Sequence, residues 1–78
     1  MIKRKVQLNN LAEIRDFIIL SSKYRCNIKV KACNKIVDGK SMMGIISLMA
    51  HQPLTIIAEG EDACEFAGQL DKSRYLLQ

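Results

Sequence analysis

The sequence lacks any long apolar run. No stretch approaches the roughly 18 to 20 residues that a helix needs to cross a bilayer. Residues 1–6 are basic but lack the apolar stretch of about 7 to 15 residues that is typical of a signal peptide. We therefore expect a cytoplasmic protein with no membrane attachment.

Histidine and cysteine are also scarce. The three cysteines, Cys26, Cys33 and Cys64, include no Cys-x-x-Cys pair, and their odd number does not fit a disulfide framework. We expect free thiols, no metal site and no other cofactor, because structural zinc sites usually show paired short spacings. His51 is the only histidine and falls in a predicted loop with no arginine nearby in sequence. A histidine without partners is weak support for catalysis, so we do not expect an enzyme.

Aromatic residues make up only 5% of the chain, and no two of them form a pair on a predicted strand. Sheets that bind RNA use such pairs to stack bases. The net charge of +4 comes from lysines and arginines that are spread along the sequence. We expect no direct binding to nucleic acid, and attraction to acidic partner proteins explains the charge better.

The 78 residues are enough for one small domain, which we assign to residues 1–78. Alternating apolar residues predict strands at 2–8, 26–32, 35–37 and 54–58. Apolar residues at helical spacing predict helices at 11–23 and 41–50, and a last helix after Gly60. The order βαββαβα is typical of an α+β protein with helices on one face of an antiparallel sheet. A ferredoxin-like domain would share most of this order.

Several side chains define the ends and faces of these elements. Asn10, followed three residues later by Glu13, predicts a variant capping box at the start of the first helix. Arg4 is the one misfit on the apolar face of the first strand. The buried stripe of the last helix is predicted to be Ala63, Phe66, Ala67 and Leu70.

The segment 40–48 is the most distinctive in the sequence. Ser41 is a plausible N-cap, because its hydroxyl can accept a hydrogen bond from an unpaired N–H of the first turn. A short helix then carries more apolar side chains than one buried stripe needs: Met42, Met43, Ile45, Ile46, Leu48 and Met49. The pattern Lys-Ser-x-Met-Gly-x-x-Ser-Leu resembles the regulatory-serine helix of HPr, the phosphocarrier of the bacterial sugar phosphotransferase system. Residues 20–24 similarly resemble the end of the first helix in that family.

The resemblance covers nearly the whole chain and implies the open-faced β-sandwich of HPr, with a four-stranded antiparallel sheet and three helices on one face. It also implies that Ser41 is the site of a dedicated kinase. Lys40, Met42, Met43 and Ile46 would then form a partner-binding surface. The alternative from the residues alone is that Ser41 only caps the helix and that the methionines only fill the core.

The histidine of the HPr family lies at the start of the first helix, in the motif Gly-Ile/Leu-His-Ala-Arg-Pro. Alignment without gaps places this motif on residues 8–13, with Asn10 at the histidine, Ala12 at the arginine and Glu13 at the proline. An asparagine amide is not a nucleophile, because its nitrogen lone pair is delocalised into the carbonyl. Ala12 removes a positive charge and Glu13 adds a negative one, so we expect no histidine phosphotransfer at this site.

The expected function is therefore that of a regulatory binding protein. The similarity to the catabolite-repression relative of HPr, which also lacks the histidine, implies a serine kinase/phosphorylase and a transcriptional regulator, or enzymes of the phosphotransferase system, as partners. One alternative is an HPr-fold interaction module that is not phosphorylated at all. The other alternative is a phosphocarrier that carries the phosphoryl group on another residue.

Overall fold

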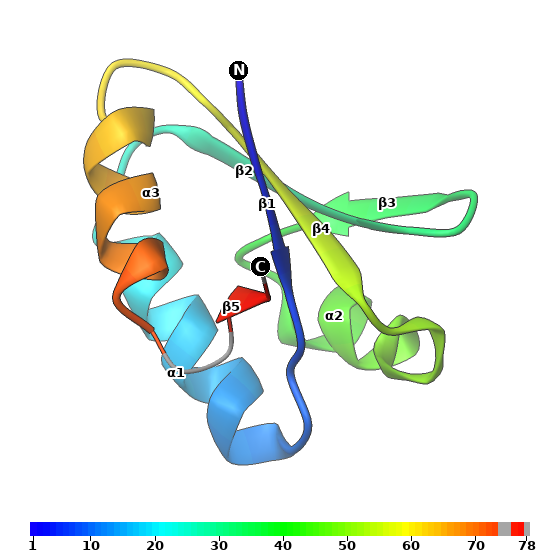
Figure 1. Cartoon of the computed structure of the whole chain (residues 1–78). Coiled ribbons are helices and arrows are strands. Elements are labelled where there is room, and N and C mark those ends of the chain that lie inside the picture. The colour runs from blue at the N-terminus through cyan, green and yellow to red at the C-terminus, as the bar shows by residue number, and fades with distance from the viewer. Residues whose placement is uncertain (74–75, 78) are drawn as a thin grey trace.

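The computed structural model describes residues 1–73 and 76–77. Four strands, β1 (Ile2–Val6), β2 (Asn27–Ala32), β3 (Lys35–Asp38) and β4 (Leu54–Glu59), alternate with α1 (Leu11–Ser22), α2 (Met42–Ser47) and α3 (Ala63–Asp71) in the order βαββαβα (Figure 1). The expected α+β fold with three helices and four antiparallel strands is confirmed. Among the described residues, no helix is long and apolar enough to cross a bilayer.

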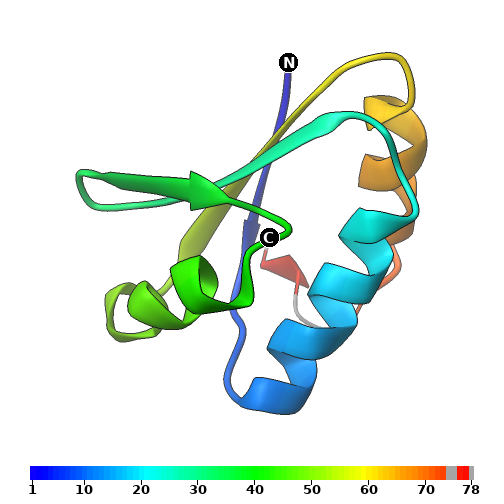
Figure 2. The same cartoon turned by 180° about the vertical axis from the view of Figure 1, so that it is seen from behind.

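The sheet has the strand order β3-β2-β4-β1-β5, and every neighbouring pair is antiparallel. The fifth strand, β5 (Leu76–Leu77), was not expected from the sequence, because two residues are too few to show an alternating pattern. It pairs with the end of β1. The β2–β3 hairpin extends away from α1 and α3, as Figures 1 and 2 show.

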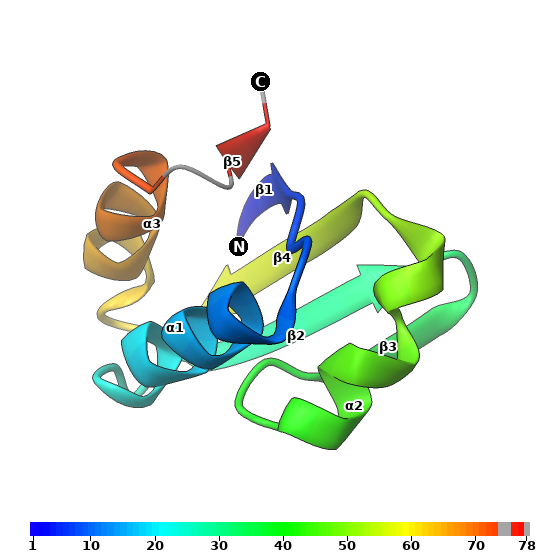
Figure 3. The same ribbon diagram turned by 90° about the horizontal axis from the view of Figure 1, so that it is seen from below.

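The helices cover one face of the sheet, and α1 and α2 lie on the same side of β2 and β4 in Figure 3. The strands turn alternate residues towards this face, so that β2 is strictly exposed and buried in turn. Phe17 of α1 and Phe66 of α3 are both fully buried and meet edge to face, with ring centroids 6.3 Å apart. Tyr24 also packs edge to face on Phe66, with ring centroids 5.6 Å apart.

The predicted buried stripe of α3, with Phe66 at its centre, is confirmed in full. Arg4 is half-buried, and its guanidinium reaches the rim of the core, where Nε donates to Oδ1 of Asp71 at 2.8 Å. A charged group on an apolar face is tolerated there because it is paired at the solvent boundary. Arg4, which does not fit the apolar pattern of its strand, therefore joins β1 to the end of α3.

Two elements end at least two residues before their predicted positions. β1 ends at Val6 rather than at residue 8, and α2 ends at Ser47 rather than at residue 50. The chain tightens after α2, because the N–H of Leu48 bonds to the carbonyl of Ile45, three residues back. A short 3-10 helix, η1 (Met49–His51), follows and completes the connection to β4.

Candidate functional site

The start of α1 is held by side chains that cap the helix. Asn10 has an extended backbone, and its Oδ1 accepts a hydrogen bond from the N–H of Glu13 at 2.9 Å. The carboxylate of Glu13 reaches back and accepts from the N–H of Asn9 at 2.7 Å. The expected variant capping box is therefore present. The second donor is the N–H of Asn9, whereas in the usual capping box it is the N–H of the cap residue itself. The amide oxygen of Asn10 is thus engaged in holding the helix.

A second contact braces the same loop from a distant part of the chain. Gln52 follows η1, and its Nε2 donates to the carbonyl of Leu8 at 2.7 Å. Its Oε1 accepts from the N–H of Leu8 at 3.3 Å, so one amide group satisfies both backbone groups of that residue. No sequence pattern indicates this contact, because the two residues are 44 positions apart.

His51 lies at the end of η1 and is exposed. Its Nδ1 is 3.8 Å from Sγ of Cys33, which occupies the β2–β3 turn with a positive φ of 54°. Cys26 is buried, and Cys64 lies exposed on α3. Across residues 1–73 and 76–77, no three His, Cys, Asp or Glu side chains are grouped as metal ligands would be.

Ser41 is the N-cap of α2. Its backbone is extended, and its Oγ accepts a hydrogen bond from the N–H of Gly44 at 3.2 Å. The side chain is half-buried, and the remaining lone pair of its oxygen and its own proton are not used by this bond. Ser41 therefore serves as the cap that the sequence predicted, at the positive end of a short helix.

The apolar side chains of α2 divide between the core and the surface. Ile45 and the following Leu48 are fully buried against the sheet. Met43 is 78% exposed and Met42 is 41% exposed, whereas Ile46 is only partly buried against the core. Met42 and Met43 thus form an exposed apolar surface beside the Ser41 cap, with Ile46 at its inner edge.

Lys40 points away from this surface. Its ammonium group donates to the carbonyl of Tyr24, just beyond α1, at 2.8 Å. Its backbone N–H donates to Oδ1 of Asp38 at 2.9 Å. In this arrangement Lys40 ties the start of α2 to the end of α1, and it would have to leave Tyr24 to reach a group on Ser41.

Gly44 allows α2 to approach β3 closely. A Cβ atom at this position would lie 2.9 Å from Cβ of Val37, which is closer than real Cβ atoms come to one another. The cost of glycine inside a helix, about 1 kcal/mol relative to alanine, is thus compensated by the packing of α2 on the sheet.

Two glycine substitutions should have opposite effects on stability. Gly44→Ala should lower the free energy of unfolding by about 1 kcal/mol, because overpacking of this kind costs about 1–3 kcal/mol and exceeds the gain in helix propensity. Gly68→Ala in α3, where a Cβ atom would meet nothing within 4 Å, should instead raise it by about 0.5–1 kcal/mol. Urea unfolding of both variants measures the difference. A stabilised Gly44→Ala variant would contradict the contact with Val37.

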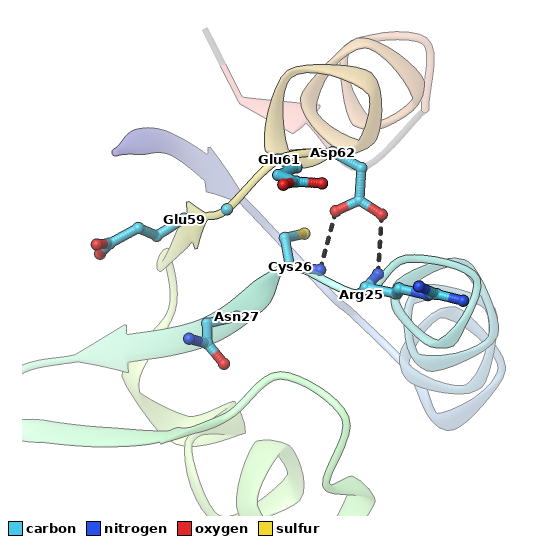
Figure 4. A pocket seen from close by; sticks show the side chains of 7 residues that line it. Arg25, Cys26, Asn27, Glu59, Glu61 and Asp62 are labelled. Atoms are coloured by element: carbon cyan, nitrogen blue, oxygen red, sulfur yellow. Dashed lines mark hydrogen bonds between the residues drawn. The ribbon is translucent and has the colours of Figure 1, made fainter.

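An acidic loop joins β4 to α3 and borders a surface cavity of about 270 Å³ (Figure 4). Asp62 is the N-cap residue of α3, but its side chain makes no hydrogen bond to that helix. Its two oxygens instead accept from the backbone N–H groups of Arg25 at 2.8 Å and Cys26 at 2.9 Å. These bonds hold the pKa of the Asp62 carboxyl below its usual value, and the bond from the N–H of Arg25 has the largest effect. Burial raises the pKa of the neighbouring Cys26 thiol.

Glu61, Asp62 and Glu65 place acidic residues at the start of the last helix in the sequence, where they suit the positive end of its dipole. In the structure, Asp62 is used to fasten the start of β2 to the start of α3. Asp71 has a similar role at the other end of α3, where the hydrogen bond from Arg4 lowers the pKa of its carboxyl. Both carboxylates are thus occupied in joining elements that are distant in sequence.

Acid should weaken the fold through these two carboxylates. A depressed folded-state pKa stabilises the protein at pH values above the ordinary value of 3.8. This contribution is lost as the pH falls below 3.8 and through the lower folded-state values. Urea midpoints should therefore be steady near neutral pH and decline in this acidic range. Asp62→Asn should be less stable than the parent at pH 7 and should lose less stability on acidification. Asp16 is an exposed residue of α1 outside these contacts, so Asp16→Asn should have the same dependence of stability on pH as the parent.

Comparison with known proteins identifies the relatives of this arrangement. A family model described as the PTS HPr component phosphorylation site matches residues 13–73. The match begins at Glu13, just after Asn10 and Ala12. No curated protein sequence matches the chain.

Solved structures with the same fold include phosphocarrier protein HPr from Bacillus anthracis, with 30% identity and a TM-score of 0.68, where the match covers 88% of each chain. HPr-C-His from Thermoanaerobacter tengcongensis is 28% identical, with a TM-score of 0.69 and coverage of 88% of this chain and 86% of that one. The catabolite repression protein Crh of Bacillus subtilis is 26% identical, with a TM-score of 0.68 and coverage of 91% and 83%.

Proposed function

The chain belongs to the HPr phosphocarrier family, and from that membership we propose that it is a regulatory, partner-binding protein that does not carry phosphate on histidine. The observation that carries the proposal is the contrast between two helix starts. At α1, alignment without gaps assigns Asn10 to the position of the family's histidine, and the amide of Asn10 caps the helix. At α2, Ser41 stands where the family has its regulatory serine, beside exposed methionines.

The chemistry at α1 is unsuited to phosphotransfer. A neutral imidazole attacks phosphorus through a nitrogen lone pair, which the amide of Asn10 cannot supply. Ala12 offers no positive charge to the oxygens of a transferring phosphoryl group. The carboxylate of Glu13, fixed by the N–H of Asn9, would repel it. His51 is held near Cys33 rather than at a helix start, and it does not replace the missing nucleophile.

Ser41 remains as the group that a kinase would modify. The γ-phosphoryl group of ATP would pass to Oγ of Ser41, the hydroxyl proton would leave to a base of the kinase, and ADP would depart. The product adds a charge of about −1.5 to −2 at the positive end of α2. The free N–H groups of the first turn favour a negative charge there by about 0.3–1 kcal/mol. Met42 and Met43 lie next in the chain, so a partner that covers them would also meet the phosphate.

Membership in the HPr family supports proteins as the partners of the surface formed by Met42 and Met43. We propose a cytoplasmic serine kinase/phosphorylase that acts on Ser41 and a transcriptional regulator, or enzymes of the phosphotransferase system, that dock on Met42, Met43 and Ile46. Crh of Bacillus subtilis, named for catabolite repression, is among the relatives with this fold and supports the regulatory assignment. A second candidate function is an interaction module whose Ser41 only caps α2, which the hydrogen bond to Gly44 favours.

Two incubations distinguish these functions by intact mass. With ATP and the cognate serine kinase, the protein should gain one phosphoryl group, and Ser41→Ala should gain none. Ser47→Ala, which changes an exposed serine of the same helix, should behave as the parent. With phosphoenolpyruvate and the first enzyme of the phosphotransferase system, no phosphate should be gained. An acid-labile phosphate in the second incubation would refute the proposal, and no gain in either would leave the unmodified interaction module.

A further inference from the structure

The face of the sheet opposite the helices carries a cluster of lysines. Cross-strand register places Lys3 and Lys29 on either side of Ile57 in one row, and Lys5 and Lys31 on either side of Thr55 in the next. The four lysines are exposed. Strands lie about 4.8 Å apart and alternate residues about 6.8 Å apart, so the four Cα atoms mark a rectangle of about 10 by 7 Å. We name Lys3, Lys5, Lys29 and Lys31 the basic face.

The basic face accounts for the whole net charge of the protein. The chain has 12 lysines and arginines against 8 aspartates and glutamates, so outside the basic face the two signs balance. None of the four ammonium groups is joined by a hydrogen bond or ion pair to another side chain in the described part of the chain. The outward acidic residues of these strands, Asp38 and Glu59, lie at the margin, beside Lys29 and Asn27 respectively.

A shallow cavity of about 310 Å³ opens within the basic face. Lys3 and Lys31 flank it, and Thr55 and Ile57 of β4 also line it, with Pro53 at one end. The cavity offers two positive charges, a hydroxyl donor and an apolar surface, which together fit an acidic side chain and its methylene groups. Its position over β4 is on the opposite side of the sheet from the helices.

We propose that the basic face binds an acidic segment of a partner protein, with one carboxylate between Lys3 and Lys31. In an extended chain, alternate side chains are about 6.8 Å apart, which matches the spacing of Lys3 to Lys5 and of Lys29 to Lys31. An extended segment that follows β4 with acidic residues at alternate positions meets both pairs. This site is separate from Ser41 and α2, so a partner here and a partner there can bind at the same time.

The chemistry of the basic face favours a polypeptide over other anions. Single-stranded nucleic acids are held by aromatic side chains on which bases stack, and the outward positions of β1 to β4 carry none. Stable attachment of a basic surface to anionic lipid also requires an apolar group that inserts into the membrane. Ile57, the central apolar residue, is partly buried between lysines, and Ile36, which is 59% exposed opposite Lys31, is a single apolar side chain on the edge strand.

Binding of a short fluorescein-labelled polyglutamate peptide to the full chain tests the proposal by fluorescence anisotropy. The peptide should bind at low ionic strength and more weakly at physiological salt, where charges are screened over about 8 Å. Lys3→Gln/Lys31→Gln should weaken binding by about fivefold or more, because it removes the charges at the centre of the contact. Lys23→Gln/Lys72→Gln changes the net charge equally on the helix side and should weaken it by less than about twofold.

Amide chemical shifts of the parent should change on β1, β2 and β4 and not on α2 when the peptide is added. Both double variants should keep the urea midpoint of the parent, since all four lysines are exposed. Equal weakening in the two variants, or no binding at low salt, would overturn the proposal. So would tighter binding of an oligothymidine of equal charge or of phosphatidylglycerol vesicles. Phosphorylation of Ser41 does not enter these outcomes, so they are independent of the proposed function.

Discussion

Phe66→Ala should lower the free energy of unfolding by about 3–5 kcal/mol, a large part of the stability of so small a domain. Phe66 is fully buried and contacts both Phe17 and Tyr24 edge to face. Removing a buried phenyl ring costs about 3–5 kcal/mol, and the usual stability per residue gives a 78-residue domain about 4–12 kcal/mol in total. The substitution therefore removes much of what holds α3 and α1 on the sheet.

Urea unfolding followed by circular dichroism measures this effect. With a slope of about 1 kcal/mol per molar urea for a protein of this size, the midpoint should fall by about 3 M or more. Met43→Ala provides the control, because that side chain is 78% exposed and surface changes stay within about 0.5 kcal/mol. A loss below about 1 kcal/mol for Phe66→Ala would contradict the central position of Phe66 in the core.

Introducing the family's histidine and arginine at the start of α1 should create a site for histidine phosphotransfer, which under the proposed function the parent lacks. The triple variant Asn10→His/Ala12→Arg/Glu13→Gln supplies a nucleophilic imidazole and a positive charge for the phosphoryl oxygens. Glutamine at position 13 keeps an oxygen that can accept the N–H of Asn9 and removes the repelling charge. With phosphoenolpyruvate and the first enzyme of the phosphotransferase system, this variant should gain an acid-labile phosphoryl group.

The matched control is Asn10→Ala/Ala12→Arg/Glu13→Gln, which has the same charge changes without the imidazole and should gain nothing. Intact mass before and after mild acid reads out both variants. Loss of the Asn10 cap should cost both of them about 1 kcal/mol of stability, so their urea midpoints verify that each is folded. A folded triple variant that takes up no phosphate would contradict the assignment of Asn10 to the position of the family's histidine.

Local signals in the sequence predicted most of the fold. The alternation of β2, the Asn10 and Ser41 caps and the buried stripe of α3 all depend on residues within a few positions of one another, and all are present in the structure. The boundary of α2 was missed because a 3-10 turn continues the same apolar spacing past Ser47.

The contacts that fasten these elements together could not be predicted. Asp62 bonds to the chain 36 and 37 residues away, Gln52 to a residue 44 away and Arg4 to a residue 67 away. No local pattern indicates any of these contacts, because each partner lies in another element of the fold. The basic face was likewise hidden, because Lys3 and Lys29 become neighbours of Ile57 only once β4 lies between their strands.

β1 has no strand partner until the chain has been synthesised as far as β4. Ile2 pairs with Ala58 and Val6 with Leu54, and β5 follows later still. Pairings between residues so distant close large loops before they gain any contact energy, which makes folding slower than in a helical bundle of the same length. Val6, which is fully buried in the folded protein, therefore gains its strand partner Leu54 only after most of the chain has been made. β4, the middle strand, therefore has to lie between β2 and β1 before the two sides of the sheet are joined.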